Sequence, residues 1–256
     1  MLYLERQNKI LRLLDENMSV SVNDLVQKLK VSSVTVRKML GAMARQGLLQ
    51  RTRGGAVSYA MSFRELSFLD KTNTNVSEKK AIAKVAYAMI NDQETIYLDA
   101  GTTTHELVRL IKNGKKRNLV VVTDAMNIAS ELLYAHDINL ILSGGELRPG
   151  VISCVGPIAE QALEALHFDK TFLGANNVSL KFGASTPNLL EARMKICAIK
   201  NSEKTYLLCD SSKFAGASMA KICPLDTFNA IITDNHLETK IRSEFKKAKI
   251  KLIIAD

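Results

Sequence analysis

Polar residues and glycines follow an apolar run near the middle of the chain. The run "TIYLD" (95–99) ends in Asp99, and Gly101 and the threonines Thr102, Thr103 and Thr104 come next, before a helical pattern begins. Glycine allows a tight turn without a Cβ, and threonine hydroxyls and free N–H groups at a helix start can donate to a phosphate. The pattern favours a phosphate site, although a plain helix cap has the same residues. The GxxxxGK[ST] loop of nucleotide hydrolases is absent, so ATP is not predicted.

Four more polar or glycine clusters follow later apolar runs. In parallel sheets, ligands bind beyond the carboxyl ends of the strands, so such clusters are expected to converge there. Successive clusters after successive strands are hard to explain as turns alone, and they predict a small-molecule site. The clusters are Thr123-Asp124, Gly144-Gly145-Glu146 with Arg148, Asn176-Asn177, and Asp210-Ser211-Ser212-Lys213.

The apolar runs themselves predict the architecture of residues 77–256. They are β-branched, nearly continuous and separated by helical stretches, which indicates a Rossmann-like, mostly parallel sheet with helices on both faces. A helix is predicted to open this domain at Ser77. The runs are "TIYLD" (95–99), "LVVVT" (119–123), "INLILS" (138–143), "KTFLGA" (170–175), "KTYLLC" (204–209), "NAIIT" and "KLIIA" (251–255).

Residues 1–57 differ from the rest of the chain in charge. They hold ten Lys or Arg against four Asp or Glu, a net +6 out of the +9 of all 256 residues. Such asymmetry indicates contact with a polyanion, although a merely solvated basic surface would have the same charge. The first 57 residues are therefore the candidate nucleic-acid-binding part.

The periodicity of these 57 residues predicts a winged helix-turn-helix. A first helix ends near Glu16, a short second helix starts at Ser21, and a third follows the turn "KVSS" with Val36, Leu40 and Met43 on one apolar line. A Gly-Gly dipeptide between two short strand-like runs then predicts a basic hairpin, the wing. The last helix of this motif enters the major groove. The candidate DNA-binding residues are Ser33, Thr35, Arg37, Lys38, Arg45, Arg51 and Arg53.

Residues 58–76 lose clear periodicity and are predicted to be a linker, giving a domain at 1–57 and another at 77–256. No stretch has the ~18 uninterrupted apolar residues that a membrane span needs, and the charged N-terminus does not resemble a signal peptide. A cytoplasmic protein that contacts no membrane is expected. The four cysteines have no CxxC spacing and are expected to be buried and reduced, with no metal or cofactor.

The segment "ERQNKILRLLDENMSVSVNDLVQKLKVSSVTVRKMLGAMARQGLLQRTRGGA" resembles the DNA-binding region of DeoR-type bacterial repressors. Two positions depart from the family pattern. Lys38 stands where a second Arg is usual, and Met39 replaces an Asp. Lysine cannot form a bidentate fork, so a softer contact and a different operator are expected.

The resemblance continues through "LDAGTTT", "LVVVTDAMNIASEL", "LILSGGELRP", "CVGPIAEQAL", "DKTFLGA", "STPNLLEA" and "LLCDSSKF", which are similar to segments of the DeoR-type effector domain. That domain resembles ribose-5-phosphate isomerase in fold and senses phosphorylated sugars in many members. The resemblance implies that the threonine loop holds the phosphate and that Asp99, Gly144, Gly145, Glu191, Asp210 and Lys213 line the sugar side. Asp124 stands where the family commonly has Asn, which is expected to add negative charge.

The resulting hypothesis is a repressor that binds double-stranded operator DNA as a homodimer or homotetramer and is released by a phosphorylated sugar. One alternative is an isomerase-like enzyme with a DNA-binding appendage, in which Asp99, Glu191, Asp210 and Lys213 transfer protons. Another is an architectural DNA-binding protein with an inert second domain, which the post-strand clusters disfavour. The preferred hypothesis assigns no catalytic residue.

Overall fold

The computed structural model describes residues 3–17, 19–45, 48–52, 54–57 and 68–256. The chain divides into two compact units, Met1–Glu65 and Leu66–Asp256. The boundary falls inside the predicted linker 58–76, of which residues 58–67 lie outside the described residues. Residues from Phe68 onward belong to the second unit, which therefore includes residues 68–76 of the predicted linker.

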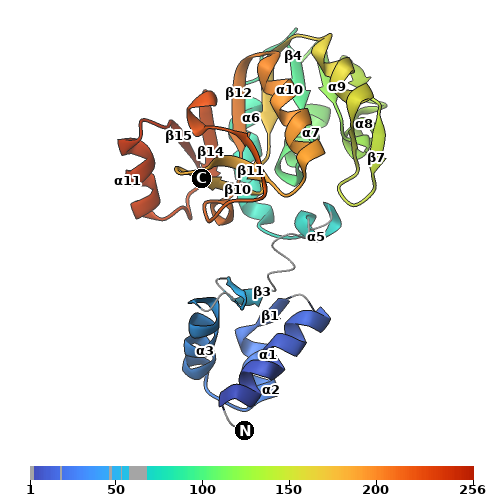
Figure 1. The fold of residues 1–256 in the computed structure, drawn as a ribbon. Coiled ribbons are helices and arrows are strands. Elements are labelled where there is room, and N and C mark those ends of the chain that lie inside the picture. The colour runs from blue at the N-terminus through green and yellow to red at the C-terminus, as the bar shows by residue number, and fades with distance from the viewer. Residues whose placement is uncertain (1–2, 18, 46–47, 53, 58–67) are drawn as a thin grey trace. The chain divides into compact units, whose positions relative to one another are not determined.

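The described residues of the first unit form the helices α1 (Tyr3–Asn17), α2 (Val22–Leu29) and α3 (Ser33–Arg45) (Figure 1). Ser21 caps α2 by accepting from the Asp24 N–H at 3.0 Å, and Ser32 precedes α3 and accepts from the Thr35 N–H at 3.2 Å. Both bonds satisfy donors that a helix start leaves free. The predicted order of helices is therefore confirmed, and Ile10, Leu25 and Leu40 are fully buried between them.

The wing is a three-stranded sheet rather than an isolated hairpin. Its strands are β1 (Ser19–Ser21), β2 (Gln50–Arg51) and β3 (Gly55–Val57), in the order β1-β3-β2. β3 pairs antiparallel with both neighbours. A Cβ on Gly55 would lie 1.8 Å from the Val20 carbonyl oxygen, so this position requires glycine for close approach of β1.

The second unit is built on a seven-stranded sheet in which every neighbouring pair is parallel, in the order β15-β14-β12-β9-β4-β5-β6. All seven predicted runs form its strands. They are β4 (Thr95–Leu98), β5 (Leu119–Thr123), β6 (Ile138–Leu142), β9 (Phe168–Leu173), β12 (Ser202–Leu208), β14 (Ala230–Asp234) and β15 (Leu252–Ala255).

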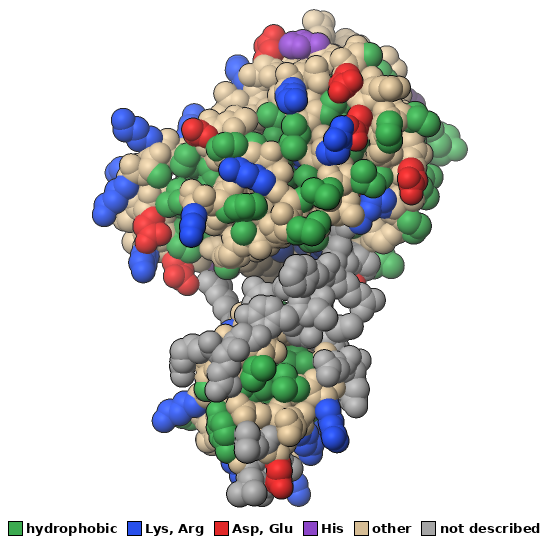
Figure 2. Space-filling model, viewed as in Figure 1, with side chains coloured by type: hydrophobic (Ala, Val, Ile, Leu, Met, Phe, Trp, Pro, Cys, Tyr) green, Lys and Arg blue, Asp and Glu red, His purple; other side chains and the backbone are tan. Residues whose placement is uncertain are grey.

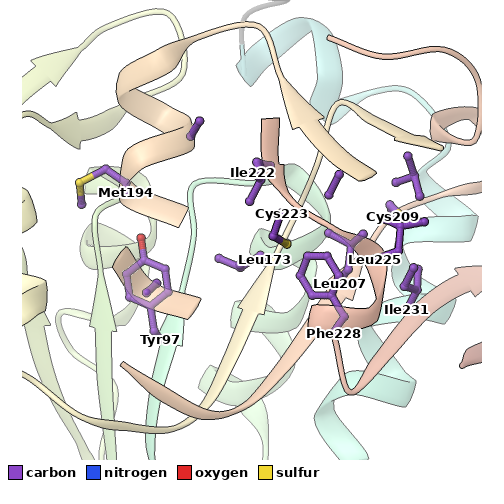
Figure 3. Packing of buried hydrophobic residues seen from close by; sticks show 14 of the residues in the cluster. Tyr97, Leu173, Met194, Leu207, Cys209, Ile222, Cys223, Leu225, Phe228 and Ile231 are labelled. Atoms are coloured by element: carbon purple, nitrogen blue, oxygen red, sulfur yellow. The ribbon is translucent and has the colours of Figure 1, made fainter. Parts of the chain in front are cut away.

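Helices cover both faces of this sheet, as predicted (Figure 1). One apolar cluster joins one face to α6 (Val76–Ala88), α7 (Thr102–Asn113) and α8 (Met126–Leu132). The other cluster joins the opposite face to α9 (Pro157–Glu164), α10 (Leu189–Lys200) and α11 (Thr239–Lys247). Figure 3 shows part of this second cluster, where Leu207, Ile222 and Phe228 from different elements pack together.

Several short elements were not predicted. The hairpin β7 (Glu146–Arg148) and β8 (Ser153–Val155) follows β6, and β10 (Asn177–Ser179), β11 (Gly183–Thr186) and β13 (Ala220–Cys223) form a separate antiparallel sheet. The helix α5 (Phe68–Thr72) lies within the predicted linker. Phe68 attaches α5 to α7, because its buried ring contacts the His105 ring edge-on, with 5.4 Å between the ring centroids.

Candidate DNA-binding surface and effector site

The candidate DNA-binding surface lies on α3 and the wing. Val36, Leu40 and Met43 are fully buried, while Arg37 and Lys38 are exposed. The buried apolar residues and the exposed basic residues lie on different faces of α3, because helical spacing separates residues that are one or two positions apart. Figure 2 shows Lys and Arg side chains standing out from the surface around these helices.

The remaining predicted DNA-binding residues divide into three groups. Ser33 and Arg51 are exposed, whereas the Thr35 hydroxyl lies 2.9 Å from the Ser32 hydroxyl and so helps to cap α3. Arg53 and the side chain of Arg45 lie outside the described residues. Met39, one of the two departures from the family pattern, is 3% exposed and packs in the core, which removes it from the outer face.

In the second unit, Asp99 is the centre of a buried polar cluster at the carboxyl ends of the strands. Its Oδ1 accepts from the Gly101 N–H at 3.0 Å and from the Thr104 hydroxyl at 2.6 Å. Its Oδ2 accepts from the Gly174 N–H at 2.7 Å and pairs with the Lys195 ammonium. Asp99 therefore ties the ends of β4 and β9 to α10.

The threonine loop starts helix α7, as predicted, but its threonines have different roles. Gly101 is the N-cap and supplies no side-chain cap to the first turn. Thr104 is fully buried and donates its hydroxyl hydrogen to Asp99. Thr102 is half-buried and Thr103 is 6% exposed. The first-turn N–H groups and these two threonines are the candidates for anion binding.

A second group of charges joins α10 to the β7-β8 hairpin. The Glu191 carboxylate accepts from Arg148 Nη1 at 2.9 Å and from the Ser153 hydroxyl. Glu191 and Lys195 are four residues apart on α10, so one turn of this helix presents an acid and a base to the same region. Glu191 and Arg148, predicted from different segments, are thus brought together.

Charges inside this buried cluster are mutually stabilised. Burial would raise the pKa of Asp99, but the Lys195 ammonium and the donated hydrogen bonds more than offset it and hold the pKa below its usual value. Burial likewise would lower the pKa of Lys195, and the carboxylates of Asp99 and Glu191 hold it above its usual value. Both groups are therefore charged at neutral pH.

Thr123 and Asp124 follow β5 and have different environments. The Thr123 hydroxyl donates to the Leu98 carbonyl at 2.7 Å and accepts from the Ala125 N–H at 3.1 Å, so it fastens β5 to β4. Asp124 is 2% exposed, and its Oδ1 has no hydrogen-bond partner among the described residues. Burial, and then the carboxylates of Glu191 and Asp99, raise the pKa of Asp124 to about 8. The negative charge expected from sequence at this position is therefore largely absent at pH 7.

The two glycines after β6 shape the approach to the hairpin. Gly144 and Gly145 have φ values of 67° and 106°, which favour glycine. A Cβ on Gly145 would lie 2.7 Å from the Val155 carbonyl oxygen. Glu146 is exposed on β7. The glycines therefore position Arg148, whereas Glu146 lies at the edge.

Asp210 and Lys213 form a separate group near the start of α6. Asp210 caps the turn at 211–213 through the Ser212 N–H at 3.0 Å, and its Oδ1 accepts from Asn75 Nδ2 at 2.9 Å. The Lys213 ammonium is 3.9 Å from Asp210 Oδ2 and is one-third exposed. Lys79 is buried nearby, and burial lowers the pKa of its ammonium.

Sequence reasoning missed the residues that complete these groups: Lys195, Ser153, Asn75, Lys79 and Tyr97. Lys195 was detectable, because it follows Glu191 by one helical turn. Ser153 lies on an unpredicted strand and Asn75 inside the predicted linker, so neither carried a signal. The apolar neighbours of Tyr97 predicted only that it lies on a strand, and nothing in the sequence indicated a role for its hydroxyl.

Two family descriptions match the chain. The DeoR-like helix-turn-helix domain matches residues 6–61, and the DeoR C-terminal sensor domain matches residues 74–235. A putative aga operon transcriptional repressor of Escherichia coli O157:H7 is 36% identical over 98% of this chain and 93% of that protein. A lactose phosphotransferase system repressor of Staphylococcus epidermidis is 34% identical over 94% and 96%.

Among solved structures, a D-ribose-5-phosphate isomerase in complex with phospho-erythronic acid has a TM-score of 0.40 and 20% identity, over 54% of this chain and 53% of that one. This similarity to the isomerase is too partial to support any conclusion about activity. In the described part of the chain, no helix is both long and apolar enough to cross a membrane. The two family matches and the nearly full-length relatives decide the identity: the chain belongs to the DeoR family of helix-turn-helix transcriptional regulators.

Proposed function

We propose that this protein represses sugar-metabolism genes and leaves its operator when a phosphorylated sugar binds the second unit. The observation that carries the proposal is the start of α7. It is a helix N-terminus without a side-chain cap, beside Thr102 and Thr103 and next to the buried cluster around Asp99. Two relatives, a putative repressor of an aga operon and a repressor of a lactose phosphotransferase system, support the sugar assignment.

A phosphate suits this helix start for electrostatic reasons. The N–H dipoles of the first turn carry partial positive charge, and donors to an anion form stronger hydrogen bonds than donors to a neutral group. Lys213 is a candidate for a further charge contact. The sugar hydroxyls would then face the Asp99, Glu191 and Arg148 side, where charged acceptors and donors are already held in place.

A sensor is favoured over an isomerase. Of the residues that the isomerase alternative would use for proton transfer, Asp99 is held in its charged form by Lys195, which makes it a poor proton-exchanging group at neutral pH. The named relatives are transcriptional repressors, which supports the same choice. We therefore assign no catalytic residue.

The protein is also proposed to act as a homo-oligomer held mainly by its second unit. A single winged helix offers limited contact area, and a symmetric dimer that reads two half-sites is the usual remedy. Light scattering should give a multiple of the 28.3 kDa chain mass at micromolar concentration. A monomer mass with and without DNA would contradict this part of the proposal.

The experiment uses a duplex selected from a random pool for binding to the full chain. Fluorescence anisotropy follows its release by glucose 6-phosphate, fructose 6-phosphate, fructose 1-phosphate, galactose 6-phosphate and ribose 5-phosphate, while NMR follows conversion of each sugar. Wild type should be released by at least one compound and should convert none. Conversion by wild type, with turnover lost in Lys213→Ala, would favour the enzyme instead.

Thr103→Glu tests the phosphate site itself. A carboxylate at this position repels a phosphate, so the variant should keep wild-type DNA affinity but lose release. Thr239→Glu is the matched control, because Thr239 is the exposed first residue of α11 and places the same charge at another helix start. A Thr103→Glu protein that is released like wild type would show that the threonine loop is only a helix cap.

A further inference from the structure

Three carboxyl groups share one buried region of the second unit, and their partners are unequal. Asp99 is paired with Lys195, and Glu191 with Arg148. Asp124 lies close enough to both carboxylates to feel their charge, yet it has no cation of its own and Oδ1 has no hydrogen-bond partner among the described residues. A buried carboxylate without a counter-charge is strongly unfavourable, whereas a neutral carboxylic acid is not.

Titratable groups from several elements surround Asp124. The Tyr97 hydroxyl comes from β4, Asp99 directly follows that strand, and Glu191 and Lys195 come from α10. From β8 comes the Cys154 thiol, whose pKa is raised by burial and then by Asp124. The only ammonium in this set is Lys195, and it is already bonded to Asp99.

Tyr97 is a second buried polar residue of this region whose hydrogen-bonding capacity the described residues leave unsatisfied. Its ring is fully buried, and Figure 3 shows its hydroxyl pointing toward α10, near Met194. Among the described residues, the hydroxyl has no partner within strict hydrogen-bonding geometry, although it lies close enough to Asp124 to interact with it. Unsatisfied buried polar atoms are rare, so the Tyr97 hydroxyl and Asp124 Oδ1 beside two ion pairs point to a functional region.

We propose that Asp124 is a positioning residue of the effector site: as a neutral acid it lets the Asp99–Lys195 and Glu191–Arg148 pairs stay together, and its ionisation disrupts them. With Asp124 neutral, two carboxylates face two cations. With Asp124 ionised, three carboxylates face the same two cations, and Lys195 is drawn between Asp99 and Asp124. The inference rests on the proposed function, since it assigns these pairs to the sugar side of the site.

The proposal makes the effector response depend on pH on the alkaline side of neutrality. A carboxyl with a raised pKa binds its proton in the folded protein and releases it as pH rises through the folded value, about 8. The fraction of protein in the competent form then falls, and the apparent affinity for an effector falls with it. Between pH 7 and pH 9 the sugar-phosphate concentration for half release should rise about tenfold.

Asp124→Asn separates this role from simple packing. Asparagine has nearly the same shape and stays neutral at every pH, so in this variant the sugar-phosphate concentration for half release should be about the same at pH 9 as at pH 7, whatever its value at pH 7. Asp124→Ala removes the polar group and should weaken the response at both pH values. A wild type released equally at pH 7 and pH 9, or an Asp124→Asn variant with the same alkaline loss, would overturn the inference.

Infrared spectroscopy of the protein alone provides a readout that needs no effector. At pH 7 the wild type should show the carbonyl stretch of a buried protonated carboxylic acid, which disappears near pH 8 and is missing in Asp124→Asn. Asp226→Asn, at an exposed position, is the control and should retain the band. Absence of the band in wild type overturns the inference. A protein that shows the band but is released by no sugar phosphate at any pH contradicts the proposed function instead.

Discussion

The recognition helix α3 and the polar cluster around Asp99 place charged residues in opposite environments. Arg37 and Lys38 are exposed on a helix whose other face is apolar. Asp99 and Lys195 are buried, and each stabilises the charged form of the other. Charge on α3 is thus available to a partner, whereas charge around Asp99 is part of the fold. Substitutions should affect binding in the first region and stability in the second.

Lys195→Met should give the largest effect. It leaves the buried Asp99 carboxylate without its counter-charge, and breaking a buried pair in this way costs about 3–5 kcal/mol. The loss should be confined to the second unit, measured as hydrogen exchange of β4 and β9 amides. Lys200→Met is the control, since Lys200 is exposed at the end of the same helix. Equal protection in both variants would mean that the pair is not a structural element.

Leu40→Ala tests the apolar side of α3. Leu40 is fully buried, and truncation should destabilise the first unit by about 2–5 kcal/mol through lost contacts and a cavity. Urea unfolding followed by α2 and α3 amide exchange measures it. Val34→Ala, at a residue 60% exposed in the same helix, should change little. A loss of protection in the β4 amides as well would show that the two units do not unfold independently.

Arg37→Ala should affect DNA binding and not stability, the reverse of Leu40→Ala. It should leave the stability of the first unit unchanged and weaken binding to the selected duplex by roughly 1–3 kcal/mol if the side chain reads a base, and by less if it contacts only phosphate. Anisotropy titrations at two salt concentrations distinguish these cases. Lys240→Ala, at an exposed position of α11, is the control for lost positive charge. Unchanged affinity in both Arg37→Ala and Lys38→Ala would remove α3 from the DNA interface.

Ser21→Ala should have the smallest effect. It removes the side-chain acceptor for the Asp24 N–H and should cost about 1 kcal/mol in the stability of the first unit. Thermal unfolding measures it, and Ser19→Ala, at an exposed serine two residues earlier, is the control. A melting temperature lowered equally by both variants would argue against a specific cap.

The same contrast explains what the sequence could predict. Helices α1 to α3 and all seven strands of the parallel sheet were predicted, because their apolar residues repeat with local periods. Glycine and threonine after a strand predicted the helix start at α7, and its binding of phosphate stays a prediction. The Asp99–Lys195 pair was not predicted, since its members lie 96 residues apart and meet only through the order of the strands. The bond from Thr104 to Asp99 was not predicted for the same reason, because it joins a helix to the end of the preceding strand through side chains.

We propose that DNA recognition in the first unit and sugar-phosphate binding in the second are coupled. Thermodynamic linkage requires the coupling to be reciprocal: an effector that weakens operator affinity by some factor must itself bind more weakly, by the same factor, when operator is present. Isothermal titration of the releasing sugar phosphate, with and without saturating duplex, measures this directly. The account predicts equal factors of about 5–150-fold for wild type. An effector affinity that is identical with and without operator would contradict it.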